Sequence, residues 1–207
     1  WLLAIPPLLL AAKNAPWGGL WKDNRATIYG LMLAVVAGLW AVKAGGIYKG
    51  LHVHLLGATL LALTYGANMA MVGLALLTLC WTAFGLGGWQ SLGANLLILA
   101  VAPTLIVRFI LHVVETRLPG NIFIYIFVVV FMGSGLTIAA VGGLATLFLI
   151  GSGAYNYPFL FENWLVSMVL NAWGEGFITG VLLTIMVVYY PHLVSTFDDE
   201  HYLKNRK

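Results

Sequence analysis

The sequence predicts an all-α membrane protein of about seven transmembrane helices, and three observations lead to that fold class. The chain has 207 residues, of which 61% are hydrophobic and only 8% are charged, whereas a soluble domain carries about 25% charged residues. Its apolar segments are long and continuous, which favours helices, because a barrel would alternate apolar and polar residues with period two. The single cysteine, Cys80, excludes an internal disulfide framework. We therefore expect one integral membrane domain over residues 1–207.

The first four predicted helices are apolar runs separated by polar or glycine-containing turns. Residues 1–12 are fewer than the ~20 that a complete span needs, so they are expected to form part of a first helix. The polar segment 13–25 follows as a loop. The next three helices are expected over residues 26–42, 51–65 and 67–84.

Three longer apolar runs complete the predicted bundle, over residues 92–112, 122–150 and 161–190. Proline removes a backbone donor, so the first of these helices is expected to kink or break near Pro103. Glycine-rich stretches predict interruptions in the other two, at residues 133–135, 142–143 and 173–176. The charged residues 191–207 are expected to form a tail.

The basic residues predict the orientation of this bundle, because cytoplasmic loops are enriched in lysine and arginine. With seven spans, one side of the membrane receives only Lys43 and Lys49. The other side receives the remaining eight, which are Lys13, Lys22, Arg25, Arg108, Arg117, Lys204, Arg206 and Lys207. We therefore expect the N-terminus outside and the 191–207 tail in the cytoplasm, in a multi-pass membrane protein.

Two histidines one residue apart, His52 and His54, are predicted near the outer end of the third helix. Histidine is the commonest metal ligand. Residues i and i+2 of a regular helix point about 200° apart, so the pair converges on an ion only if this part of the chain is extended. The alternative is a pair that does not converge and binds no metal. The other three histidines, His112, His192 and His201, are predicted on the opposite side of the membrane. The ~30 Å hydrocarbon core separates them from His52 and His54, so the two groups cannot share one ion.

Polar residues inside predicted spans are costly and usually functional. Glu175 is either a ligand, gate or coupling residue, or a hydrogen-bonded residue that locks helix contacts, and the sequence leaves both open. Asn95, near the outer end of the fifth helix, either caps that end, which is the commoner outcome, or lines a cavity. The GxxxxGK[ST], HExxH, CxxC and GxSxG signatures do not occur. We therefore expect no nucleotide site in this chain and no enzymatic activity.

Four short motifs occur in an order and spacing that resemble one family. They are HLLGA at residues 54–58, Gly66, GGWQSLGAN at residues 87–95 and GEGFITG at residues 174–180. Together they resemble the cobalt/nickel energy-coupling-factor permease family, CbiM/NikM-like membrane subunits, and in particular a proteobacterial membrane-protein branch of it. The resemblance covers most of the chain. Each motif is short, so only their combination is specific.

The resemblance implies a seven-helix, substrate-binding membrane subunit with its N-terminus outside. It implies that a divalent transition metal is held near the outer face by His54, the best match, and its neighbour His52. Asn95 and Glu175 match family motif positions with supporting roles. The implied partners are a transmembrane coupling subunit and ATPases, which would supply the energy.

The start of the chain departs from the family pattern, in which the N-terminal amine and a histidine at the second position also hold the ion. Trp1-Leu2-Leu3 offers no such ligand, so either that segment lies outside this sequence or this branch has lost most of the site. Two histidines with water still suit Ni²⁺, Co²⁺ or Cu²⁺. The expected function is a substrate-binding subunit of an energy-coupling-factor type transporter. The alternative is a non-transporting, permease-like accessory subunit of a larger membrane complex such as a metalloenzyme.

Overall fold

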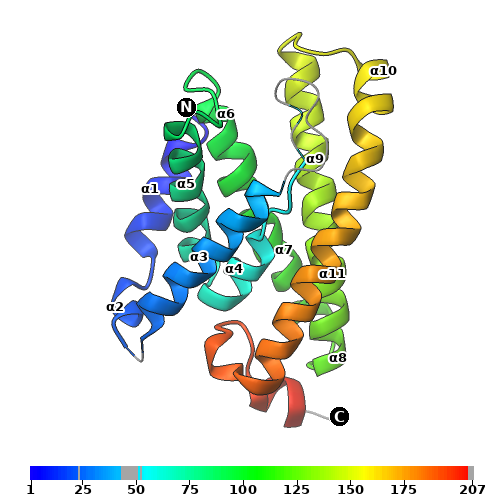
Figure 1. The fold of residues 1–207 in the computed structure, drawn as a ribbon. Coiled ribbons are helices and arrows are strands. Elements are labelled where there is room, and N and C mark those ends of the chain that lie inside the picture. Colours follow the sequence, from blue (N-terminus) through cyan, green and yellow to red (C-terminus); the bar gives the residue numbers. More distant parts are fainter. Residues whose placement is uncertain (23, 43–50, 52, 205–207) are drawn as a thin grey trace.

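Helices account for 79% of the chain in the computed structural model, which describes residues 1–22, 24–42, 51 and 53–204 (Figure 1). The N-terminal helices are α1 (Ile5–Asn14), α2 (Trp17–Leu20), α3 (Arg25–Ala41), α4 (Ala58–Tyr65) and α5 (Ala67–Ala83). Within the described residues no element is a strand. The prediction of an all-α protein is confirmed.

The C-terminal part consists of three long helices, each of which passes through a π-helical segment. The first contains α6 (Leu92–Leu96), η1 (Leu97–Val101) and α7 (Ala102–Arg117). The second contains α8 (Ile122–Ile124), η2 (Tyr125–Met132) and α9 (Gly133–Gly151). The third contains α10 (Tyr157–Leu160), η3 (Phe161–Leu165) and α11 (Val166–Tyr189). Two short helical segments follow, the 3₁₀-helix η4 (Pro191–Leu193) and the π-helical η5 (Glu200–Lys204).

The lengths of these helices suit a lipid bilayer. The three long helices contain 26, 30 and 33 residues and are apolar enough to cross a membrane, which takes ~20 residues. The apolar helices α3 and α5 contain 17 residues each. The fold is therefore that of an α-helical membrane protein.

The predicted third helix, over residues 51–65, is wrong in its first half. Helix α4 begins only at Ala58, and residues 53–57 approach it as irregular backbone. The reason lies at Gly57, whose φ of 68° is in the left-handed region and interrupts a helix. A Cβ at this position would also lie 2.7 Å from Cγ2 of Val36 on α3. Close packing against α3 therefore decides where α4 starts, and hydropathy does not report it.

Of the interruptions predicted at proline and glycine, the one near Pro103 lies beside a π-helical irregularity, whereas those at residues 142–143 and 173–176 are wrong. Pro103 lies in the first turn of α7, where a missing N–H is tolerated, and the irregularity is the π-helical η1 just before it. Both α9 and α11 run unbroken through their glycines. The glycines serve close contact instead: a Cβ at Gly135 would lie 3.2 Å from the carbonyl oxygen of Ala172, and one at Gly176 would lie 3.0 Å from that of Phe131. Small residues allow such approach between membrane helices.

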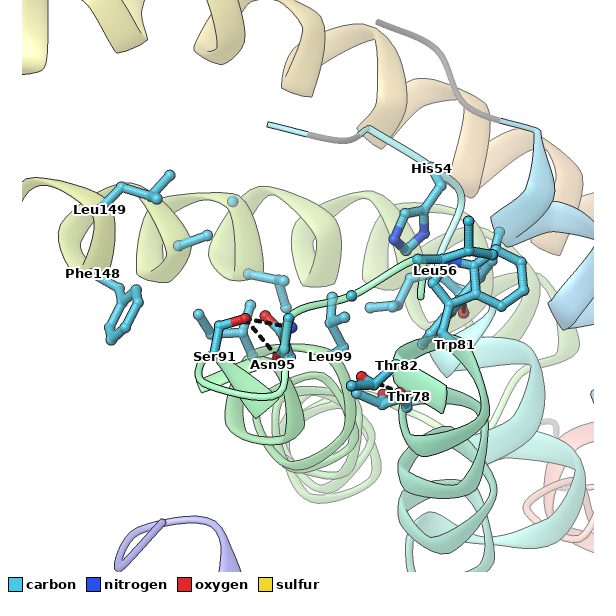
Figure 2. A pocket seen from close by; sticks show the side chains of 18 of the residues that line it. His54, Leu56, Thr78, Trp81, Thr82, Ser91, Asn95, Leu99, Phe148 and Leu149 are labelled. Atoms are coloured by element: carbon cyan, nitrogen blue, oxygen red, sulfur yellow. Dashed lines mark hydrogen bonds between the residues drawn. The ribbon is translucent and has the colours of Figure 1, made fainter. Parts of the chain in front are cut away.

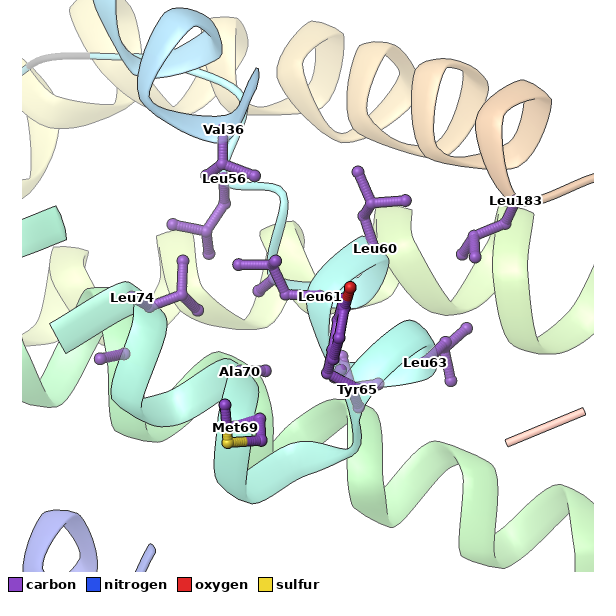
Figure 3. Close-up of a cluster of buried hydrophobic side chains, with 14 of the residues drawn as sticks. Val36, Leu56, Leu60, Leu61, Leu63, Tyr65, Met69, Ala70, Leu74 and Leu183 are labelled. Atoms are coloured by element: carbon purple, nitrogen blue, oxygen red, sulfur yellow. The ribbon is translucent and has the colours of Figure 1, made fainter. Parts of the chain in front are cut away.

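The short helix α4 lies at the centre of the core. All eight of its residues are buried, so it is apolar on every side, as expected for a helix surrounded by protein. Its neighbours come from three helices (Figure 3). They include Val36 of α3, Met69, Ala70 and Leu74 of α5, and Leu183 of α11.

The segment after the last long helix packs under the C-terminal end of α4. The backbone N–H groups of Ser195 and Thr196 donate to the carbonyl oxygens of Thr64 and Leu63, at 3.1 and 3.2 Å. The hydroxyl of Thr196 donates to Leu63 as well, at 3.0 Å. These bonds satisfy carbonyl groups that the end of a helix leaves without an intrahelical partner. The beginning of the predicted tail is thus part of the folded core.

Candidate functional site

A cavity of about 760 Å³ opens between the N-terminal helices and the long helices α9 and α11 (Figure 2). One wall is the irregular segment that precedes α4, and other walls come from α5, α6 and α9. Most lining side chains are apolar or aromatic. The polar ones among the described lining residues are His54, Thr78, Thr82, Ser91, Asn95 and Asn171, together with the indole groups of Trp40, Trp81 and Trp164.

The segment that carries His54 is fixed to the surrounding helices through its backbone. The indole Nε1–H of Trp40 on α3 donates to the carbonyl oxygen of Leu56 at 3.1 Å. The side-chain amide of Asn171 on α11 donates to the carbonyl oxygen of His54 at 3.0 Å. Irregular backbone at membrane depth is tolerated where protein groups satisfy it. The two bonds therefore hold the histidine-bearing segment in one place.

Glu175 completes this attachment from α11. Its side chain is only 3% exposed, and its two oxygens accept hydrogen bonds from the backbone N–H groups of Leu56 and Gly57, each at 2.7 Å. These donors precede α4, whose N-terminus carries a partial positive charge. The carboxyl group thus lies at the start of α4 and is engaged with backbone rather than with the cavity, which is the arrangement of a positioning residue.

His54 itself lies on the cavity wall, half-buried. Its ring packs against Trp40 with centroids 4.9 Å apart, and its Nδ1 lies 3.2 Å from the carbonyl oxygen of Leu55. The neighbouring His52 lies outside the described residues. The irregular backbone at residues 53–57 is the kind of geometry that a converging His-x-His pair needs, because a regular helix would turn the two rings apart.

Asn95 lines the cavity and does not cap its helix. It lies inside α6, where its side-chain amide is 3.4 Å from the hydroxyl of Ser91. Figure 2 shows Ser91 and Asn95 on one side of the cavity and His54 on another. Of the two alternatives, lining a cavity therefore describes Asn95, and capping does not, since Ser91 occupies the position before α6 and makes no side-chain cap either.

The remaining histidines do not contribute to this site. Among the described residues, His112, His192 and His201 are absent from the cavity wall, and no group of three or more His, Cys, Asp or Glu side chains converges on a point that could hold a metal ion. Of the residue types that commonly bind metals, the described lining contains only His54. Any ion bound here would take its other ligands from elsewhere.

The sequence prediction did not identify Asn171 or the three tryptophans of the cavity. A signal for Asn171 was present, because it precedes Glu175 by four positions in an apolar run and residues at that spacing share a helix face. The two polar side chains attach the same segment from the same helix. No comparable signal marks Trp40, Trp81 and Trp164, since tryptophan is common in membrane helices and at their ends.

Comparison with known proteins gives one family and one fold. A family model described as the cobalt uptake substrate-specific transmembrane region matches residues 1–193. A solved structure described as a truncated transition metal transporter has a TM-score of 0.70 and 21% identity, covering 89% of this chain and 90% of the other. A second, described as a transition metal transporter, has a TM-score of 0.69 and 23% identity, covering 95% and 88%. A search of curated proteins finds no match. At these identities the two structures establish a shared fold.

Proposed function

Since the chain belongs to the family of cobalt uptake substrate-specific transmembrane regions, we propose that it is the substrate-binding membrane subunit of an energy-coupling-factor type transition-metal transporter. It is a transport component and not an enzyme. The observation that carries this function is the cavity whose wall bears His54 on a segment held from two helices. A fixed ligand beside an open space suits a protein that binds an ion and then releases it.

His54 is the proposed metal ligand, and His52 is proposed beside it. Ni²⁺, Co²⁺ and Cu²⁺ are the proposed substrates, because imidazole suits all three. Glu175 supports the site by orienting the backbone after His54. Asn95 supports it as a neutral polar group on the facing wall.

The proposed topology has seven spans, with the N-terminus outside and residues 191–207 in the cytoplasm. Residues 1–207 form one membrane domain, in which residues 1–12 are part of the first helix. The charge distribution of eight basic residues against two supports this orientation in the bacterial inner membrane. The chain has no GxxxxGK[ST] sequence, so the proposed partners are a transmembrane coupling subunit and ATPases that supply the energy.

Metal content of the purified protein tests this function. We expect near-stoichiometric nickel, cobalt or copper by plasma mass spectrometry, and its loss in a His52→Ala/His54→Ala variant. His192→Ala is the control, because His192 is exposed and far from the cavity wall. Metal retained in the double variant would refute the site. A metal-free wild type that co-purifies with subunits other than transport ATPases would favour the accessory-subunit alternative.

A further inference from the structure

We propose that a second pocket, between α4, α5 and α7, binds the phosphate of an anionic phospholipid from the leaflet that meets the C-terminal end of α7. Phosphatidylglycerol is the simplest lipid of this class. The pocket shares no described lining residue with the cavity of His54, so the inference goes beyond the proposed function. It rests on an unpaired arginine beside the pocket, on the depth of that arginine in its helix and on its apolar surroundings.

The pocket measures about 250 Å³ and lies where α4, α5 and α7 meet (Figure 1). At about 30 Å³ for each water-sized group, it has room for about eight such groups, which is of the order of a phosphate with its glycerol. Its polar lining residues are Arg108 on α7, Asn68 on α5 and Thr196. The other described lining residues are apolar, namely Ala62, Leu63, Ala67, Val107 and Leu111. One charged group beside an apolar wall suits an amphiphilic anion.

Arg108 supplies the charge of this pocket and has no counter-ion within the described part of the chain. Its side chain is exposed, and no hydrogen bond or ion pair joins its guanidinium to another described residue. No described lining residue is Asp or Glu. An arginine on a membrane helix is costly unless an anion or water meets it. The pocket therefore presents a cation whose anion has to come from outside the described chain.

The position of Arg108 along its helix places this cation near the phosphates of a bilayer. The helix from Leu92 to Arg117 contains 26 residues and is about 39 Å long, whereas the hydrocarbon core is about 30 Å thick. Arg108 lies nine residues before the last one, about 13 Å along the axis. A centred helix extends about 4 Å beyond each side of the core, so Arg108 lies about 9 Å inside it. From there its long side chain extends towards the headgroups.

The surroundings of Arg108 favour a lipid phosphate over a free one. Leu105 and Phe109 flank it on the exposed side of α7, with 46% and 67% of their surfaces exposed. On a spanning helix such a face is covered by acyl chains, and a phospholipid brings its phosphate together with those chains. The first turn of α5, at Ala67 and Asn68, lies in the same pocket wall and adds the partial positive charge of a helix N-terminus.

Native mass spectrometry of the purified full chain, with phosphatidylglycerol or phosphatidylcholine added, tests the inference. We expect one phosphatidylglycerol to be retained in preference to phosphatidylcholine, whose choline cation offsets its phosphate. In Arg108→Gln, the apparent Kd for phosphatidylglycerol should rise about ten-fold, the effect of one charge-assisted hydrogen bond. Arg117→Gln is the matched control, because Arg117 is an exposed arginine of the same helix that does not line the pocket.

Three outcomes overturn the proposal. Equal retention of the two lipids, or equal weakening in the two arginine variants, would mean that no specific site exists. Displacement of the lipid by an equal concentration of inorganic phosphate would assign the pocket to free phosphate. Unchanged lipid binding in Arg108→Gln, with loss of a co-purifying membrane subunit, would assign Arg108 to a protein contact.

A second variant separates the pocket from its charge. Ala67→Leu narrows the pocket and keeps Arg108, so we expect it to weaken phosphatidylglycerol binding about ten-fold as well. The thermal midpoint in detergent without added lipid shows whether each variant is folded. A folded Ala67→Leu variant that binds the lipid as the wild type does overturns the role of the pocket. Metal content should stay unchanged in both variants, so failure of this inference leaves the proposed function standing.

Discussion

Glu175 lies inside an apolar helix, and its carboxyl group accepts two backbone hydrogen bonds there. Its carboxyl group joins α11 to backbone positions 119 and 118 residues earlier in the chain. Each of the two N–H groups would otherwise be a buried donor without an acceptor, which costs about 1–3 kcal/mol. A carboxyl group is suited to this place because it offers two acceptor oxygens and no competing donor when ionised.

We predict that Glu175→Gln destabilises the protein by about 1–3 kcal/mol. The amide oxygen can still accept one bond, but the amide NH₂ group then faces a backbone N–H. Glu175→Ala, which loses both acceptors, should be less stable still. Thermal unfolding in detergent measures the change, and Glu162→Gln at an exposed position is the control. A Gln variant as stable as wild type would contradict this role.

Tyr202 gives a prediction for high pH in the segment that follows the last long helix. Burial, together with the carboxylates of Glu115 and Asp198, raises the pKa of the Tyr202 phenol to about 12 from its ordinary value of 10.0. Because the folded-state pKa is the higher one, the contribution of Tyr202 to stability is complete below pH 10 and is lost as the pH rises towards 12.

We therefore expect the residues after Tyr190 to loosen as the pH rises from about 10 to 12. In a pH titration followed by tyrosinate absorbance, the Tyr202→Phe variant should lack one tyrosine that ionises near pH 12. Tyr157→Phe is the matched control, since Tyr157 is exposed. If the two variants lost the same component, the assignment to Tyr202 would be wrong.

The sequence identified individual functional side chains better than it identified the residues that they contact. Both Glu175 and His54 stood out because ionisable side chains are rare in apolar runs. Their relation, in which Glu175 fixes the backbone that follows His54, joins positions more than a hundred residues apart and leaves no mark in local spacing. Asn171 could have been found from its spacing to Glu175, whereas Trp40 could not.

Helix ends and irregularities were predicted less well than helices. Proline and glycine were expected to break the long helices. The π-helical segments η1 and η2 do end close to Pro103 and Gly133, but none lies at residues 142–143 or 173–176. Helix α4 begins at Ala58 and not at residue 51 as predicted, because the left-handed turn at Gly57 leaves no mark in hydropathy. In each case, contacts between helices decide the backbone conformation more than the residue type does. Gly57 packs against Val36 where α4 begins, and other glycines let helix backbones approach one another.

Two glycine variants test this account of the elements. A Cβ at Gly180 on α11 would collide with the ring of Phe131 on η2, whereas a Cβ at Gly143 on α9 would meet nothing within 4 Å. We expect Gly180→Ala to destabilise by about 1–3 kcal/mol. Gly143→Ala should be neutral or stabilise by up to about 1 kcal/mol. Thermal unfolding of both variants measures the difference, and equal midpoints would contradict the packing.

For the whole molecule, composition predicted a membrane protein, because a chain with 8% charged residues cannot cover a water-facing surface. The long continuous apolar segments predicted that it is helical. The long apolar helices bear this out. The family was also predicted, from motifs whose order and spacing mattered more than any one of them, and the match over residues 1–193 confirms it. The count of seven spans and their orientation stay predictions.

Cysteine accessibility in a Cys80→Ser background measures that orientation. We expect cysteines placed at Trp89 and Ser152 to react with an impermeant maleimide in intact cells. Cysteines at Lys22 and His192 should react only after the membrane is opened. All four positions are exposed. Reaction of the second pair in intact cells would reverse the proposed orientation.

The attachment of residues 53–57 also bears on how the chain is synthesised and inserted. Leu56 and Gly57 leave the ribosome well before Glu175, which follows 119 and 118 residues later. Until then their N–H groups have only water or another protein to bind, and lipid offers neither. This stretch must therefore wait at the water boundary or inside the insertion machinery until α11 follows and Glu175 reaches it.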